Sequence, residues 1–413
     1  MSGVLLLSLA ELLCAQNASL KSASYPGNIW EQETLTNNFF GLGESLAENG
    51  IEVGLGITSI YQQNIHGGLS THRRAGRNSG SYDLELLADL QKLLGIEGGN
   101  LYVHTEGGWT DTEGIDGVSV GSVFGVNADA IGNRAMDLIE LFYEGTIFGE
   151  SLNLMVGKID FTAVFDCSAY ADDELTQFLN SAFVDNPTIP FPDYSLGVVL
   201  SCNPTGSWYI MGGVADAQAD GRESGFRTAF HKEDYFLYLF ETGITPELES
   251  ANGPLLGAYR VGLWNDPQPK GNSDAAKNYR DDVGFYLSCD QMLTKENAEP
   301  EDNQGLGAFF RYGYANSKKH DITNFWSLGF QYQGLIEGRH EDVLGAGFAQ
   351  GIFSNSASAT YTEDYESVIE LYYSARITPW ASISPSVQYV TNPGGDKTVS
   401  DAVILGVRAQ IMF

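Results

Sequence analysis

The sequence predicts an all-β protein: a single transmembrane antiparallel β-barrel of about sixteen strands, with a short N-terminal helix and a long inward-folding loop. Apolar and polar residues alternate along many short segments, which is the period of a strand with two different faces. Clusters of Gly, Asn, Asp and Pro separate these segments. Charged residues make up only 18% of the 413 residues, while Gly reaches 48, Tyr 21 and Phe 22, a mixture typical of strands and tight turns.

The first fifty residues contain two elements that precede the strands. The apolar run "GVLLLSLAELLCA" is too short to span a bilayer as a helix. It is typical of a secretory signal, although no positive charge precedes Lys21, so we interpret residues 1–18 as a truncated signal segment. Residues 28–50 are expected to form a loop and a short helix that ends at Gly50.

Residues 51–413 are expected to form the barrel. An even number of segments shows the alternation, and their lengths cluster near the roughly nine to eleven residues that a tilted membrane strand needs. The predicted strands are 51–61, 82–90, 101–107, 137–145, 152–158, 195–201, 207–216, 234–243, 255–264, 281–288, 305–314, 325–333, 342–352, 366–378, 381–390 and 402–413.

The last strands show the two faces most clearly. In "ESVIELYYSARIT" one row is apolar throughout, and the other carries Glu370 and Arg376. The terminal "AVILGVRAQIMF" has an apolar row that ends in Phe413, and Arg408 belongs to the opposite row. A face rich in Arg, Glu and Gln fits an aqueous lumen better than the dry interior of a two-layered sandwich.

Strands that cross hydrocarbon must close into a ring, because no water is present to satisfy a free sheet edge. The last strand is therefore expected to pair with the first. Pro385 argues against this arrangement, since a closed barrel has no free edge and Pro lacks one ladder donor.

The stretch 160–192, "DFTAVFDCSAYADDELTQFLNSAFVDNPTIPFP", alternates too little for a strand pair. Loops of this length usually carry a function. We expect it to fold into the barrel and narrow the lumen.

Strand parity predicts which charged and aromatic side chains line the pore. An Arg at the lipid midplane would cost roughly 2–4 kcal/mol, which favours an inward position wherever parity allows it. Lys158 is the weakest candidate, because its own row is apolar. The candidates for contact with a solute are Glu140, Glu144, Lys158, Asp160, Arg260, Trp264, Arg311, Glu370, Arg376 and Arg408.

Net charge and cysteine spacing exclude several other classes. A charge of −31 argues against nucleic-acid binding, which needs clustered Lys and Arg. Cys167, Cys202 and Cys289 lack the C-x-x-C spacing of zinc and redox sites, and export would permit one disulfide among them without indicating which. The acidic segments 111–117 and 216–225 lack the EF-hand spacing. No metal or cofactor is expected.

Residues 117–121, "GVSVG", match the nucleophile elbow of serine hydrolases around Ser119. That elbow requires a strand, a sharp turn and then a helix, and the residues that follow show little helical pattern. No base or orienting carboxylate can be assigned to Ser119, so we expect no enzyme.

Several phrases carry a family resemblance. "TLTNNFFGLGESLAENGIEVGLGITSIYQQNIHGGL", "ELFYEGTIFGESLNLMVGKID", "FLNSAFVDNPTIPFPDYSLG" and, most specifically, "QYQGLIEGRHEDVLGAGFAQGIFS" with "YESVIELYYSARITPWASISPSVQYVTNPGG" resemble the carbohydrate-selective porins of the OprB type. The resemblance covers the chain from about Leu35 to Phe413. It implies a sixteen-stranded barrel in the outer membrane of a Gram-negative-type bacterium, with loops that narrow a passage for sugars. The corresponding phrase of this family also contains a proline at the position of Pro385.

The expected function is therefore passive, carbohydrate-selective diffusion of mono- or oligosaccharides through an aqueous lumen. The alternatives are a general porin that prefers cations, a structural outer-membrane barrel, and a barrel hydrolase that uses Ser119. The expected partners are sugar solutes, outer-membrane lipids and the barrel assembly machinery, which would bind the C-terminal strand ending in Phe413. A homo-trimer is a further possibility.

Overall fold

The structure is a computed structural model, and it describes residues 29–110, 114–148, 152–230, 233–271, 278–279, 281–299, 302–356 and 359–413. The predicted signal segment, 1–18, lies outside the described residues. Within the described residues, no helix combines the length and apolar character needed to cross a bilayer.

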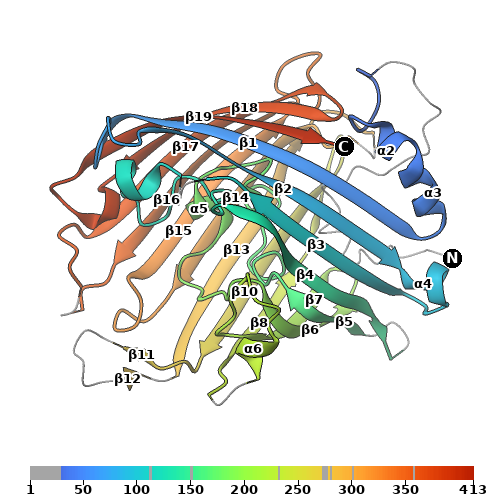
Figure 1. Cartoon of the computed structure of the whole chain (residues 1–413), viewed down its shortest axis with the longest axis horizontal. Helices are drawn as coiled ribbons and strands as arrows, with labels where there is room; N and C mark the ends of the chain where they lie inside the picture. The colour runs from blue at the N-terminus through green and yellow to red at the C-terminus, as the bar shows by residue number, and fades with distance from the viewer. Residues whose placement is uncertain are drawn as a thin grey trace.

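One antiparallel sheet forms the wall of the molecule (Figure 1). Its strands are β1 (Ile51–Gly68), β2 (Gly76–Asp89), β3 (Gly99–Gly108), β4 (Arg134–Ile147), β5 (Leu152–Ile159), β6 (Ser195–Thr205), β7 (Trp208–Asp216), β8 (Phe236–Ile244), β9 (Glu247–Ser250), β10 (Gly253–Asp266), β13 (Asp282–Lys295), β14 (Gly305–Tyr314), β15 (Ile322–Gln333), β16 (Val343–Phe353), β17 (Tyr365–Thr378), β18 (Ala381–Thr391) and β19 (Ser400–Met412).

β8 and β9 are two parts of one wall strand. Both pair with β10, and only Thr245 and Pro246 separate them. Pro246 has no N–H to donate, so the hydrogen-bond ladder is interrupted there while the strand keeps its direction. Counted this way, the described residues form sixteen wall strands, as predicted. β11 (Lys270–Gly271) and β12 (Asn278–Tyr279) form a separate two-stranded sheet outside the ring.

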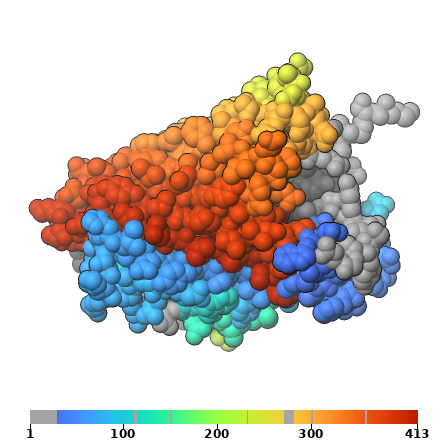
Figure 2. Space-filling model, turned by 90° about the horizontal axis from the view of Figure 1, so that it is seen from above, coloured from blue at the N-terminus to red at the C-terminus, as the bar shows by residue number. Residues whose placement is uncertain are grey.

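The ring closes through β1 and β19. Their register runs from Gly56 opposite Met412 to Gly68 opposite Ser400. Figure 2 shows the consequence on the surface, where the N-terminal strands (blue) lie directly beside the C-terminal strands (red). Because the first strand pairs with the last, neither keeps a free edge, which confirms the predicted closure.

Pro385 lies inside a wall strand, and the ladder accommodates it. It stands opposite Val407 of β19. On the other side, the pairing of β17 with β18 lapses between Tyr372 opposite Ser386 and Ala375 opposite Ile383. Pro385 has no backbone N–H to donate, and its position coincides with this gap in the β17–β18 hydrogen-bond ladder.

The strands turn apolar rows outward. On β17, Ile369 and Leu371 are 50% and 44% exposed, whereas Glu366 and Glu370 of the alternate row are fully buried. The same alternation recurs on neighbouring strands and leaves a continuous apolar band around the outside. A soluble protein rarely exposes an apolar surface of this extent, so the band fits contact with lipid.

The connections differ at the two ends of the barrel. One end has short turns together with α2 (Asn37–Phe40), α3 (Leu42–Glu48) and α4 (Leu90–Leu94). The other end has the long loops, which contain η2 (Asp116–Val120), α5 (Ser181–Val184), α6 (Phe226–Ala229) and η3 (Pro393–Gly395). α3 lies within the predicted segment 28–50, and Gly50 follows it with a φ of +86° that favours glycine.

Replacing an outward residue by Arg should destabilise the barrel in a membrane. We expect Leu405→Arg to lower the free energy of unfolding in lipid vesicles by roughly 2–4 kcal/mol, because it places a charge in the lipid-facing row. Gln410→Arg on the lumen row of the same strand is the matched control and should change it by about 0.5 kcal/mol or less. Denaturant titrations of both variants would measure the difference. Equal losses would contradict the outward assignment of Leu405.

Candidate functional site in the barrel lumen

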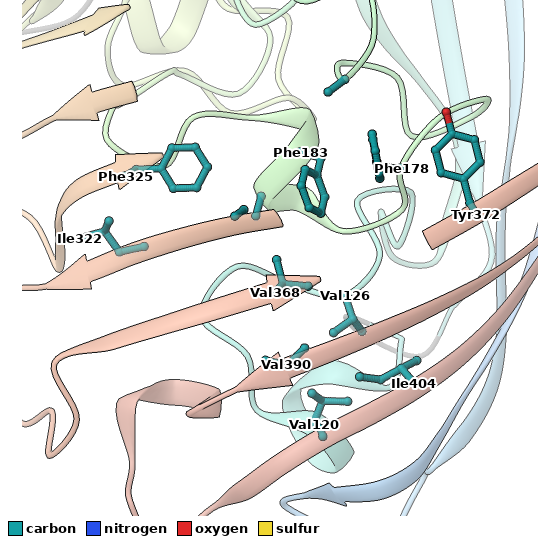
Figure 3. Packing of buried hydrophobic residues seen from close by; sticks show 14 of the residues in the cluster. Val120, Val126, Phe178, Phe183, Ile322, Phe325, Val368, Tyr372, Val390 and Ile404 are labelled. Atoms are coloured by element: carbon teal, nitrogen blue, oxygen red, sulfur yellow. The ribbon is translucent and has the colours of Figure 1, made fainter. Parts of the chain in front are cut away.

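The long inward loop (residues 160–194) enters the lumen and packs there through aromatic side chains. Phe178 and Phe183 stack with ring centroids 4.4 Å apart, and Phe178 meets Tyr372 of β17 edge-on at 4.9 Å (Figure 3). Phe309 of β14 contacts both rings. Gly347 lets this cluster approach the wall, because a Cβ there would lie 2.6 Å from the Phe183 ring. The loop therefore lies inside the barrel and packs against its wall.

Wall carboxylates hold the loop by its backbone. Glu370 accepts the amide N–H groups of Leu179 and Asn180, each at 2.9 Å. Glu241 accepts the amide of Asp166 at 3.0 Å and two tyrosine hydroxyls from neighbouring strands. Hydrogen bonds with an ionised acceptor are stronger than neutral ones, and they also satisfy amides that the loop could not pair internally.

Wall arginines hold the loop by its carbonyl groups. Arg311 donates to the carbonyls of Phe183 and Val184 at 2.9 and 3.1 Å and to the carboxylate of Asp172 at 2.6 Å. Arg408 donates to the carbonyls of Glu174 and Gln177 at 2.5 and 2.9 Å.

Arg260 contributes indirectly to the same attachment. Its guanidinium lies 2.7 Å from Asp290, and that carboxylate also accepts the Ser168 hydroxyl at 2.6 Å. The loop is thus attached to strands spaced around much of the ring.

The short inward loop (residues 114–133) fills a second part of the lumen. The carbonyl of Val126 accepts side-chain amides of Gln62 and Gln388 at 2.7 and 2.9 Å. The N–H of Ala128 donates to the Leu179 carbonyl at 2.8 Å, which joins the two inward loops.

Ser119 belongs to the short inward loop and has a structural role. Its fully buried hydroxyl donates to the Ser70 carbonyl at 2.7 Å. Asn64 of β1 contacts the same hydroxyl. The segment Asp116–Val120 is a single turn of π-helix, so the strand–turn–helix context of a nucleophile elbow does not surround Ser119.

Four predicted pore residues lie on the lumen side but beneath the loops. Arg311, Arg408, Glu370 and Trp264 are at most 2% exposed. The ring of Trp264 packs against His320 with centroids 5.4 Å apart. Parity places these side chains on the expected face, yet a solute does not reach them. Parity alone cannot show that a loop covers the wall.

Lys158 points away from the lumen, and its prediction as a pore residue is wrong. It shares a row with Val156, which is 39% exposed on the outer face. Its ammonium donates to the carbonyls of Leu138, Gly221 and Glu223, each at 2.8 Å. The outer loop (residues 217–230) folds over this part of the wall and supplies two of the three acceptors that replace water around the charge.

Two further candidates on the wall lie away from the loop attachment. Arg376 is on the lumen row at the short-turn end, where its guanidinium lies 3.2 Å from Glu341 and stays 41% exposed. Glu144 is buried on β4, opposite Asn100 and Met155 on the adjacent strands.

A different part of the wall keeps exposed polar side chains that face the lumen. On β2, β3 and β4, the side chains of Asp83, His104 and Glu140 are 13%, 16% and 13% exposed. Both ring nitrogens of His104 contact carboxylates, Asp83 at 3.1 Å and Glu140 at 3.3 Å. Glu140 is among the pore residues predicted from the sequence, whereas Asp83 and His104 are not. The alternation in "LYVHTE" was the signal that could have placed His104 on the lumen row.

Asp160 lies where the long inward loop leaves β5. Its N–H donates to Glu140 at 3.0 Å, and its carboxyl accepts from Thr162. Burial, reinforced by the Glu140 carboxylate, raises the pKa of Asp160 to about 7.

No cluster of three or more His, Cys, Asp or Glu residues within the described ranges is arranged to hold a metal ion. Cys167, Cys202 and Cys289 are free thiols in the structure, so the disulfide that export would permit does not form there.

Comparison with known proteins agrees with this architecture. The profile described as "Carbohydrate-selective porin, OprB family" matches residues 73–413. The chain belongs to this family. It is an outer-membrane sugar porin of a Gram-negative bacterium, as the sequence predicted.

Individual relatives are distant in sequence. Porin B of Pseudomonas aeruginosa is 22% identical over 453 aligned residues, covering 99% of this chain and 96% of that protein. Porin AaxA of Chlamydia muridarum is 24% identical over 272 residues, covering 66% of this chain and 54% of that one. The high-pH structure of Pseudomonas putida OprB superposes with a TM-score of 0.80 at 20% identity, covering 93% of this chain and 99% of that chain. At this identity the superposition shows the fold alone.

Removing a wall carboxylate should loosen the constriction. In Glu370→Ala, the amides of Leu179 and Asn180 lose a charged acceptor, and the seated loop should lose about 3 kcal/mol. We expect larger and more variable single-channel conductance in planar bilayers, and faster proteolysis within residues 160–194. Glu249→Ala, an exposed position on β9, is the matched control. Unchanged conductance in Glu370→Ala would show that this carboxylate does not hold the loop.

The charge of the lumen should change near neutral pH. Because the pKa of Asp160 is about 7, its carboxyl is mostly neutral at about pH 6 and mostly ionised at about pH 8. Cation preference, measured as the reversal potential in a KCl gradient, should therefore increase as the pH rises across this range. Asp160→Asn should reduce the step. A step of the same size in Asp160→Asn would assign it to another group.

Proposed function

We propose that sugars diffuse through the passage between the long inward loop and the lumen-facing wall of β2, β3 and β4. The observation that carries this proposal is the uneven covering of the wall. Arg311, Glu370 and Arg408 are sealed beneath the loop, whereas Asp83, His104 and Glu140 retain exposed surface. A hydroxyl-rich solute exchanges its water for such polar groups, and several weak contacts allow it both to bind and to leave.

The family assignment indicates a channel, and we infer that the protein has no catalytic step. The chemistry of the passage supports this inference. Asp83 and Glu140 pair with His104, and Ser119 is committed to the Ser70 carbonyl. Diffusion through a fixed constriction needs positioning of polar groups and no activated nucleophile.

We further propose two contacts outside the lumen. The outward rows on β17 and β19, such as Ile369 and Leu405, support contact with the acyl chains of outer-membrane lipids. The amphipathic strand β19, followed by Phe413, supports recognition of the C-terminal strand by the barrel assembly machinery. Assembly as a homo-trimer would have to bury part of the same outward rows.

Liposome swelling tests the proposed function directly. Vesicles that contain the purified barrel should swell in isotonic monosaccharide, and the rate should fall steeply from mono- to di- to trisaccharides because the passage is narrow. Protein-free vesicles and vesicles with heat-denatured protein are the controls. If single channels conduct salt while no sugar enters, the protein is a general porin. If neither passes, the barrel is plugged and serves a structural role.

A further inference from the structure

The strand register gathers acidic side chains around His104 on the lumen wall. Glu85 of β2 stands opposite His104 of β3, and His104 stands opposite Glu140 of β4. One step away, Asp83 stands opposite Glu106. All of these residues belong to the inward rows, so four carboxylates from three adjacent strands surround one imidazole.

The hydrogen-bond pattern fixes the charge of His104. Both ring nitrogens lie within hydrogen-bond distance of carboxylates, and a carboxylate only accepts. Both nitrogens must therefore carry protons, and His104 is an imidazolium. The His104 imidazolium is thus a cation supplied by the wall itself, and it forms ion pairs with Asp83 and Glu140.

Glu106 is the member of the cluster that remains without a donor. It is 6% exposed, and its Oε2 atom has no hydrogen-bond partner among the described residues. The nearest cation, Arg134, lies 3.7 Å from that oxygen, which is beyond hydrogen-bond distance. A buried carboxylate oxygen without a donor is costly, and a ligand N–H group would satisfy it.

An aromatic surface adjoins the carboxylates. Tyr102 precedes His104 by two residues on the same lumen row, and its ring centroid lies 6.2 Å from the His104 ring. Phe142 of β4 packs against Tyr102 at 5.1 Å. Aromatic rings present flat apolar faces, which match the C–H faces of a pyranose.

We propose that this cluster is a subsite for the protonated amine of an amino-substituted monosaccharide. The proposal rests on the sugar-porin function and names a cationic class of sugar within it. Glu106, aided by Asp83 and Glu85, accepts the ammonium N–H groups, while Tyr102 contacts the ring. The cluster contains four carboxyl groups and only two basic groups, His104 and Arg134.

Swelling rates with three related sugars test the proposal. Glucose, glucosamine and N-acetylglucosamine share one ring, and only glucosamine carries a positive charge when assayed below the pKa of its amine. We expect glucosamine to enter faster than glucose, and N-acetylglucosamine more slowly than either. In Glu106→Gln the ratio of glucosamine to glucose rates should fall roughly fivefold, the scale of one partly screened charge contact.

Glu341→Gln is the matched control, because it removes an equally charged group at the short-turn end. It should leave the ratio unchanged. An unchanged ratio in Glu106→Gln, or glucosamine no faster than glucose in the unaltered protein, would overturn the proposal. If glucose itself fails to enter, the underlying sugar-porin function fails instead, so the two failures are distinguishable.

Competition separates an amino-sugar subsite from a general cation site. Methylammonium carries the charge of glucosamine without its ring. If methylammonium slows glucosamine uptake as strongly as galactosamine does at equal concentration, the ring contributes nothing and the proposal is wrong. If methylammonium competes more weakly than galactosamine in the unaltered protein, and this difference disappears in Tyr102→Ala, the result would support the proposal.

Discussion

Backbone hydrogen bonding in hydrocarbon is the constraint on which the rest of this structure depends. An N–H or C=O group facing lipid has no water to pair with, so every wall strand needs a neighbour on both sides. The pairing of β1 with β19 meets this requirement for the two strands that would otherwise be edges. Once the ring is closed, the alternation of residues along each strand separates a lipid face from a water face. The lumen, the loops inside it and any passage for solutes exist only because of that closure.

The lumen uses charged side chains mainly to hold backbone. Glu370 and Glu241 receive loop amides, and Arg311 and Arg408 donate to loop carbonyls. A loop inside a barrel cannot form a ladder with the wall, because the wall strands already pair with one another. Long, ionised side chains reach across the gap, and the loop groups replace the water that these charges would otherwise bind. Buried charge in the barrel is therefore part of the constriction's support.

The sequence was sufficient to predict the wall. Every predicted strand overlaps one strand of the ring, because lipid on one side and polar groups on the other impose the alternation. The largest errors lie at strand ends, such as β1, which continues from the predicted end at residue 61 to Gly68. The added residues are mostly polar or Gly, with Ile65 between Asn64 and His66, so the apolar alternation that predicts a strand is weak there.

The path of the inward loops could not be predicted in the same way. Whether Arg311 lines a passage or lies sealed beneath a loop depends on contacts between residues more than a hundred positions apart. Lys158 illustrates the same limit on the outer face, where the loop between β7 and β8 supplies two of the carbonyls around its ammonium. Strand parity predicts which face of the wall a side chain occupies, whereas the folded loops determine what that side chain contacts.

The attachment points of the long inward loop have a mechanical consequence. They lie on β8, β14, β17 and β19, which occupy separated parts of the ring. A hollow cylinder flattens easily when it is pressed from the side, and a strut tied across its bore resists that deformation. The loop proposed to border the passage is thus also a cross-brace, so bilayer tension that makes the cylinder oval must act against the hydrogen bonds that hold this loop in place.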